Sequence, residues 1–260
     1  MSVILVIVLA LATIFMVFSQ ESEFHHRRLT NVDVPKTHPR IPPTGKCSAN
    51  ESVVDDGGWC LIPSPTGDFL GPSRPLAKFH IRADRGIAHT VYGIVGPNHS
   101  LIDLGAGIGA YQVYFADNNM TFTKYLAYDG GKNVEEFTFG SVRYLNLALR
   151  VDFYPHEVSD WVLSLEVGEH IPKEYQDIYI DNLHRANRNG IIISWAIPHQ
   201  YGHSHVNCKS NDDIIKIFTE LGYAYCSHLS EKGRKRAKYS WFKKTFMVFK
   251  RSSEKINGKC

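Results

Sequence analysis

The stretch Ser100-Leu101-Ile102-Asp103-Leu104-Gly105-Ala106-Gly107-Ile108-Gly109-Ala110 decides the fold that this chain predicts. Its first part, Leu101–Leu104, is a short apolar run with one acid, as in a buried parallel strand. Three glycines then recur at every second position, which lets the backbone turn sharply and approach a ligand closely. A helix is expected to start near Tyr111, with its N-terminal N–H groups facing the turn. The stretch therefore predicts a strand, a ligand-binding turn and a helix.

Two classes of ligand compete for the turn. The spacing Gly105-x-Gly107-x-x-Ala110 also satisfies the looser dinucleotide fingerprint, and a glycine-rich turn without a ligand remains an alternative. Asp103 lies two residues before the first glycine, where a carboxylate attracts an ammonium group and repels a pyrophosphate. The pattern Asp-x-Gly-x-Gly-x-Gly resembles that of class I S-adenosylmethionine-dependent methyltransferases.

The resemblance implies an α/β fold: a Rossmann-like, mostly parallel seven-stranded sheet with a C-terminal antiparallel hairpin strand. The implied cofactor is S-adenosylmethionine. Asp129 ends a second apolar segment about 20 residues further on, where an acid would hold ribose hydroxyls. Asp152 and Phe153 resemble the family position beside the adenine, although a turn or helix-capping role for Asp152 stays open. The predicted cofactor-binding residues are Asp103, Gly105, Ala106, Gly107, Gly109, Asp129, Asp152, Phe153 and Glu166.

Strands and helices are expected to alternate from residue 76 onward, as in a parallel sheet. The expected helices begin with a helix or lead-in segment over 76–95, and the later ones are 111–118, 134–139, one opened by Pro172, and 212–221. The expected strands are 101–104, 124–128, one within 142–151, 161–165, 191–195, 223–229 and 241–249. A basic loop, Lys232–Lys238, is expected to join the last two strands, where it would attract an acidic substrate or membrane phosphates, or be merely solvated.

A pair of acids and a histidine follow the fourth expected strand. The segment Glu166-Val167-Gly168-Glu169-His170 resembles the Glu-x-x-Glu-His segment of small-molecule methyltransferases, including O-methyltransferases of ubiquinone biosynthesis. The resemblance implies a divalent cation held by Glu166, Glu169 and His170. Alternatively, Glu166 faces the cofactor and His170 acts as a general base or caps the next helix.

Three histidines follow the fifth expected strand: His199, His203 and His205. Because the pKa of histidine lies near neutrality, His199, His203 and His170 are the candidates for removing a proton from an acceptor. Zinc ligation by His199, His203 and His205 is an alternative, although no fourth ligand has the right spacing. A polar loop that faces the substrate is another.

The first 75 residues differ in composition from the rest. Residues 1–19 contain an uncharged apolar segment and read as a signal peptide or a membrane anchor. Residues 20–75 are rich in proline and read as a stalk or linker, with a possible Cys47–Cys60 disulfide. Residues 76–260 form the predicted catalytic domain.

Targeting and partners follow less directly from the sequence. The basic residues after the apolar segment favour a cytoplasmic domain, whereas glycosylation patterns at Asn50, Asn98 and Asn119 fit a lumenal glycoprotein. We expect entry into the secretory or endomembrane system, with cleavage and orientation open. The formal net charge of +3 does not indicate nucleic acid.

The sequence thus predicts an S-adenosylmethionine-dependent methyltransferase that acts on an O or N nucleophile of a small or polar acceptor. A nicotinamide-dinucleotide oxidoreductase is the first alternative. A membrane-tethered, non-catalytic protein with the same fold is the second.

Overall fold

A computed structural model describes residues 38–42, 62–63, 69–71, 74–75, 82–202, 204–252 and 260. The chain divides into two compact units, Met1–Pro35 and Lys36–Cys260, and all described residues belong to the second. The predicted apolar segment 1–19 and the Cys47–Cys60 pair lie outside the described residues. Among the helices that are described, none combines the length and the apolar character needed to cross a bilayer.

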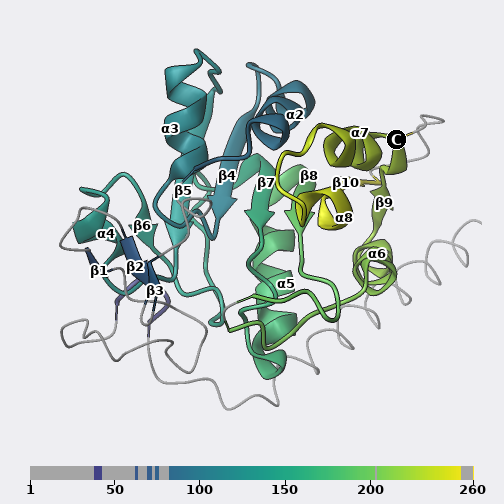
Figure 1. Cartoon of the computed structure of the whole chain (residues 1–260). Coiled ribbons are helices and arrows are strands. Elements are labelled where there is room, and N and C mark those ends of the chain that lie inside the picture. Colours follow the sequence, from purple (N-terminus) through teal and green to yellow (C-terminus); the bar gives the residue numbers. More distant parts are fainter. Residues whose placement is uncertain are drawn as a thin grey trace, which may run out of the picture. The chain divides into compact units, whose positions relative to one another are not determined.

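The centre of the described unit is a seven-stranded sheet in the order β6-β5-β4-β7-β8-β10-β9 (Figure 1). Its strands are β4 (Ser100–Leu104), β5 (Lys124–Asp129), β6 (Arg143–Tyr144), β7 (Ser159–Leu165), β8 (Asn187–Ser194), β9 (Tyr223–Tyr225) and β10 (Met247–Arg251).

The direction of the strands confirms the predicted fold class. β4 pairs in parallel with both β5 and β7, β5 with β6, and β7 with β8. β10 is antiparallel to its neighbours β8 and β9. All five residues of β4 are buried, which explains its nearly continuous apolar run.

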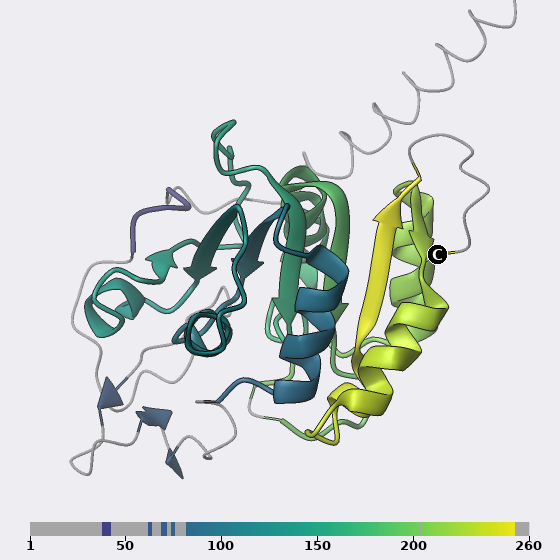
Figure 2. The same ribbon diagram turned by 90° about the horizontal axis from the view of Figure 1, so that it is seen from above.

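Helices cover both faces of this sheet. Their bounds are α2 (Arg85–Val95), α3 (Ala110–Asp117), α4 (Val134–Phe137), the 3-10 turn η1 (Lys173–Tyr175), α5 (Gln176–Arg185), α6 (Asn211–Glu220), α7 (Ser227–Arg236) and α8 (Phe242–Thr245). Apolar residues of α5 and α6 pack in one core cluster, and those of α2, α3 and α8 in another. Figure 2 shows α2, in blue, on one face of the strands.

Three expected elements are corrected by the structure. The expected strand 241–249 begins as helix α8, and only Met247–Arg251 form the strand β10. The third strand is only Arg143–Tyr144, and the following residues to Val151 form a largely buried turn rather than a strand. The predicted basic loop is mostly helix α7, and the preceding strand β9 ends at Tyr225 instead of continuing to residue 229.

The helix α7 forms because small residues let it lie close to its neighbours. Ser230 and Gly233 are its two buried residues. A Cβ atom at Gly233 would overlap the ring of Phe246, and one at Gly86 in α2 would overlap the carbonyl of Arg236. The basic side chains that suggested a loop occupy the exposed face and the last turn, where cations interact favourably with the helix dipole.

Residues 38–42 of the expected linker contact the folded part of the chain that contains the seven-stranded sheet. The Arg40 guanidinium forms two hydrogen bonds with the Glu157 carboxylate, at 2.8 and 2.9 Å, and stacks over the ring of Tyr154. Asn146 donates its backbone N–H to the Pro39 carbonyl at 2.8 Å. Further along the linker, β1 (Ile62–Pro63), β2 (Phe69–Gly71) and β3 (Arg74–Pro75) form a small antiparallel sheet.

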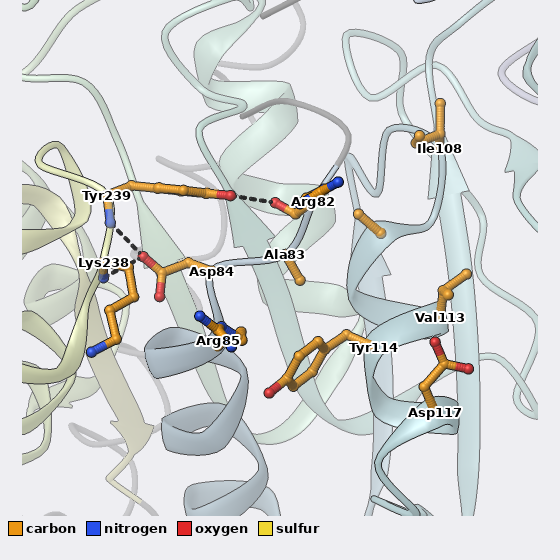
Figure 3. A pocket seen from close by; sticks show the side chains of 11 residues that line it. Arg82, Ala83, Asp84, Arg85, Ile108, Val113, Tyr114, Asp117, Lys238 and Tyr239 are labelled. Atoms are coloured by element: carbon orange, nitrogen blue, oxygen red, sulfur yellow. Dashed lines mark hydrogen bonds between the residues drawn. The ribbon is translucent and has the colours of Figure 1, made fainter. Parts of the chain in front are cut away.

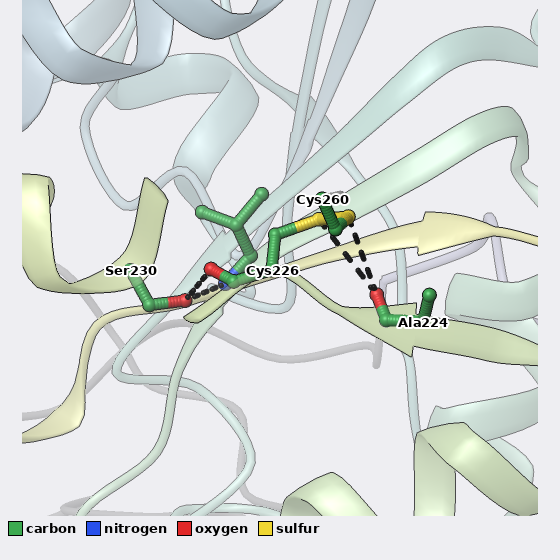
Figure 4. Close-up of a disulfide and its surroundings, with 5 residues drawn as sticks. Ala224, Cys226, Ser230 and Cys260 are labelled. Atoms are coloured by element: carbon green, nitrogen blue, oxygen red, sulfur yellow. Dashed lines mark hydrogen bonds between the residues drawn. A yellow bond between two sulfur atoms is a disulfide. The ribbon is translucent and has the colours of Figure 1, made fainter. Parts of the chain in front are cut away.

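A disulfide joins Cys226, just after β9, to Cys260 (Figure 4). The two cysteines are 34 residues apart in the sequence. Cys226 is fully buried, whereas Cys208 is free and partly exposed.

Candidate functional site

The glycine turn after β4 is built from three glycines with left-handed backbone. The φ angles of Gly105, Gly107 and Gly109 are +90°, +57° and +78°, which L-residues with side chains rarely adopt. A Cβ atom at Gly105 would overlap the side chain of Val167, so that position is required by packing. At Gly107 a Cβ atom would meet nothing within 4 Å. The turn is therefore open at its central glycine.

Asp129, at the end of β5, is joined to this turn by a hydrogen bond. Its Oδ2 accepts the backbone N–H of Gly107 at 2.8 Å, and its Oδ1 accepts that of Gly131 at 2.8 Å. Burial raises the pKa of Asp129, and these two N–H donors oppose the shift by stabilising the carboxylate. Each oxygen retains a second lone pair, so the carboxylate can still accept hydroxyl groups.

Asp103 lies inside β4 with its side chain buried. The Tyr125 hydroxyl donates to its Oδ2 at 2.8 Å. Burial raises the pKa of Asp103 to about 7, the Tyr125 hydrogen bond opposes the shift, and the nearby Asp129 charge adds to it. A cationic ligand next to Asp103 would reverse this shift, because an opposite charge favours the ionised carboxylate.

Glu166 follows β7 in a left-handed conformation, with φ of +54°. Its Oε2 accepts a hydrogen bond from Gln200 at 2.8 Å, and its Oε1 one from Thr245 at 3.1 Å. Its backbone N–H donates to the hydroxyl of Ser194. Burial raises the pKa of this carboxyl group as well. Glu166 is thus held at the same edge of the sheet as the glycine turn, because β4 and β7 are parallel neighbours.

A three-residue cluster at this edge differs from the predicted metal set. The structure brings Glu169, His170 and His205 together, with one possible ligand atom from each lying within 4.8 Å of the others. The rings of His170 and His205 meet edge-to-face at 5.1 Å. This cluster contains His205 where the predicted set contained Glu166. The Glu166 carboxylate instead accepts hydrogen bonds from Gln200 and Thr245.

The Glu169 carboxyl group fits a cation. It is fully buried, and neither of its oxygens has a hydrogen-bond partner among the described residues. Burial and the neighbouring charge of Glu166 raise its pKa well above the usual value. A buried acceptor without a donor is costly, and a bound cation would relieve that cost.

Of the other predicted histidines, the described His199 does not join this cluster. His199 is exposed, with a left-handed φ of +68°, and His203 lies outside the described residues. Of the three histidines in the alternative zinc set, the described structure groups only His205 with other possible ligands.

Asp152 and Phe153 lie at the wrong edge of the sheet for the predicted adenine contact. Asp152 forms a salt bridge of 3.0 Å with Arg185 at the end of α5, and its side chain is 92% exposed. The next residue after α5, Ala186, accepts a hydrogen bond from Ser159, where β7 begins. The glycine turn follows the opposite end of the parallel strands, so the structure does not bring these two residues to the turn.

Asn146, and not Asp152, lies close after the end of the third strand. It follows β6 almost directly, it is buried, and its Oδ1 accepts the N–H of Ala148 at 2.9 Å. The preceding residue, Leu145, donates its N–H to the carbonyl of Asp129. The third strand ends earlier than expected, so the polar residue that follows it is Asn146, six positions before Asp152.

The sequence matches no protein-family model and no curated protein. Similar solved structures include magnesium protoporphyrin IX methyltransferase from Synechocystis PCC 6803 with bound SAH (18% identity, 64% of this chain and 84% of that chain, TM-score 0.43). A TehB-like SAM-dependent methyltransferase from Corynebacterium glutamicum is 14% identical over 64% of this chain and 86% of that one, with a TM-score of 0.45. Phosphoethanolamine N-methyltransferase 1 from Haemonchus contortus is 14% identical over 68% of this chain and 44% of that one, with a TM-score of 0.46.

The chain has the fold of the class I S-adenosylmethionine-dependent methyltransferases. The feature that defines this class here is a parallel sheet completed by one antiparallel strand, β10, between β8 and β9. A fold alone does not specify the methyl acceptor.

Proposed function

We propose that the protein is an S-adenosylmethionine-dependent methyltransferase that acts on an O or N nucleophile of a small or polar acceptor. The single observation that carries the proposal is the open glycine turn at Gly107, with a carboxylate on either side, the buried Asp103 and the partly buried Asp129. S-adenosylmethionine supplies an activated methyl group to such an acceptor.

The residues around the turn have distinct roles in this proposal. Asp103 pairs with the ammonium group of the methionine portion, and the N–H groups of the turn donate hydrogen bonds to its carboxylate. Asp129 accepts the ribose hydroxyls through its remaining lone pairs. Leu145 and Asn146 lie beside the adenine. The rate enhancement comes mainly from holding the acceptor in line with the methyl group.

The cluster Glu169, His170 and His205 offers two ways to handle the proton of the acceptor. An imidazole of the pair can accept it as a general base. Alternatively, Glu169, His170 and His205 would hold a divalent cation, since one carboxylate and two imidazoles are a suitable set, and the chemistry supplied there would be Lewis-acid polarisation of the acceptor hydroxyl.

We further propose that the domain works in the secretory or endomembrane system, attached through residues 1–19 or released from them. The Cys226–Cys260 disulfide supports an oxidising compartment. Asn98 and Asn119, two of the three glycosylation positions, are exposed.

Isothermal titration calorimetry of the full chain in mild detergent tests the proposal. We expect one S-adenosylmethionine to bind per chain and Asp129→Ala to weaken it at least tenfold. Preference for a nicotinamide dinucleotide would favour the oxidoreductase alternative, and binding without any turnover to S-adenosylhomocysteine across an acceptor screen would favour a non-catalytic protein.

A further inference from the structure

A cavity of about 540 Å³ lies beside the glycine turn (Figure 3). The proposed function gives this cavity no role. One wall is the segment Arg82–Arg85 at the start of α2. The opposite wall is α3, which contributes Val113 and Tyr114, and Lys238 and Tyr239 after α7 complete it. We call this cavity the arginine pocket. Its volume is in the range of small-molecule sites.

Three cations line the arginine pocket: Arg82, Arg85 and Lys238. All three are exposed, and within the described part of the chain none forms an ion pair with a carboxylate. Their charges are therefore available to a ligand.

The two acids of the pocket do not cancel these cations at the α2 wall. Asp84 is buried, and both of its oxygens are occupied by backbone N–H groups: Oδ1 accepts from Gly86 and Ile87, and Oδ2 from Lys238 and Tyr239. Asp84 thus caps α2 and ties it to the segment after α7. The other acid, Asp117, lies on the α3 wall, away from Arg82 (Figure 3).

The rest of the lining is apolar or aromatic. Val113 is 57% exposed, so its side chain offers apolar surface to a ligand in the pocket. Tyr239 stacks on Trp241 with ring centroids 4.8 Å apart, and its hydroxyl donates to the Arg82 carbonyl. The aromatic wall and the Arg82 backbone are therefore positioned together before any ligand arrives.

We propose that the arginine pocket binds an amphipathic anion, a phosphate or carboxylate group on an apolar or aromatic body. The anion contacts the guanidinium groups of Arg82 and Arg85, which suit planar, paired recognition of such groups, and Lys238 adds a point charge. The body lies against Val113 and Tyr114. Ile108 and Ala110 belong to both the pocket lining and the glycine turn, so the ligand lies next to the methyl donor without occupying its place.

Calorimetry of the full chain in detergent with phenyl phosphate, dihexanoyl phosphatidic acid and benzyl alcohol tests this proposal. We expect at least one of the two phosphates to bind at least tenfold more tightly than the neutral alcohol. Binding of phenyl phosphate alone indicates a soluble metabolite, and binding of the phosphatidic acid alone indicates a lipid headgroup. Neither ligand should displace S-adenosylmethionine.

The variants locate the binding. Arg82→Gln with Arg85→Gln should weaken phosphate binding at least tenfold, since a hydrogen bond to a charged group is worth about that factor. Val113→Trp should weaken it from the other wall by filling the cavity. The control Arg150→Gln with Lys216→Gln removes two exposed cations elsewhere and should change nothing.

Two results would overturn the proposal: no phosphate binding at millimolar concentration, or binding that neither pocket variant changes while both retain the melting temperature of the parent. The affinity for S-adenosylmethionine is measured separately on the same samples. A pocket that binds no phosphate would therefore not contradict the methyltransferase proposal, and absence of S-adenosylmethionine binding would not contradict the pocket proposal.

Discussion

The Asp129 carboxylate at the end of β5 accepts the backbone N–H of Gly107 at 2.8 Å and so holds the open glycine of the turn in place. Asp129 is the last residue of β5, and Gly107 lies in the turn after β4. These two strands are parallel neighbours, so their carboxyl ends share one edge of the sheet. The acid therefore fixes the turn and, in the proposed function, also accepts the ribose. Asp103 lies behind the same turn, and its burial makes the site sensitive to pH.

The replacement of Asp103 by Asn should stabilise the unliganded protein above pH 7. Burial raises the pKa of Asp103 from 3.8 to about 7 in the folded chain, so folding binds a proton between these values. The contribution of this group to stability is complete below about pH 4 and is lost as the pH rises through 7. The loss is on the order of 4 kcal/mol, which Asn avoids. Denaturant unfolding at several pH values measures it.

The same carboxyl group should make cofactor affinity depend on pH. Between about pH 5 and 7 the fraction of ionised Asp103 rises, so S-adenosylmethionine should bind more tightly as its ammonium gains a partner. The Asp103→Asn variant should bind weakly and lose this pH dependence. An unchanged affinity in that variant would contradict the role given to Asp103.

The replacement of Gly107 by Ala should remove cofactor binding at a modest cost in stability. The left-handed backbone at Gly107 would cost Ala about 1–2 kcal/mol, and its methyl group would project into the open part of the turn. Gly140 is a matched control, because it also has a positive φ, of +77°, with no atom within 4 Å of a built Cβ. Both variants should lose similar stability, and only Gly107→Ala should lose S-adenosylmethionine in calorimetry. Equal retention of the ligand by both would place the cofactor elsewhere.

The cation proposal predicts that Zn²⁺ binding depends on His205. The chain should bind one Zn²⁺ in a chelator-competition assay, and His205→Ala should weaken this at least tenfold. The control is His199→Ala, which changes an exposed histidine of the same loop and should leave zinc affinity as it was. If neither variant nor Glu169→Gln alters zinc binding, the cluster is left with the general-base role.

Loss of Arg40 should destabilise the domain although it lies in the expected linker. Its removal leaves the Glu157 carboxylate buried without its cation, for which about 3 kcal/mol is expected. The control Asp152→Asn removes an ion pair whose acid is 92% exposed and should cost less than about 1 kcal/mol. Urea unfolding of the full chain compares the two. Equal, small losses would mean that residues 38–42 do not belong to the folded unit.

The fold could be predicted from the sequence where burial is continuous. β4, β5 and β8 were predicted from mainly apolar runs of sequence. Their observed bounds agree with the predicted bounds within a few residues. The end of the third strand could not be predicted, because the turn after it is also buried. Apolar residues in that turn, such as Leu147 and Leu149, give the same sequence pattern as a strand. The helix α7 was missed because its packing depends on Ser230 and Gly233, which carry no apolar period.

The candidate site also has a part that could be predicted from the sequence and a part that could not. Asp103, the glycines and Asp129 could be predicted because their roles follow from backbone geometry next to a strand end. The partners of Glu166 and the grouping of His205 with Glu169 could not, because they depend on how the loop after β8 folds back over the loop after β7. Val206 and Asn207 both donate their N–H groups to the Glu169 carbonyl, a long-range contact without a local sequence signal.

Calorimetric titration of the full chain with S-adenosylmethionine, alongside NAD under the same conditions, tests the central claim most directly. The account predicts one S-adenosylmethionine bound per chain, lost on Asp103→Asn, with no comparable heat from NAD. No binding at millimolar S-adenosylmethionine, or tighter binding of NAD, would contradict it.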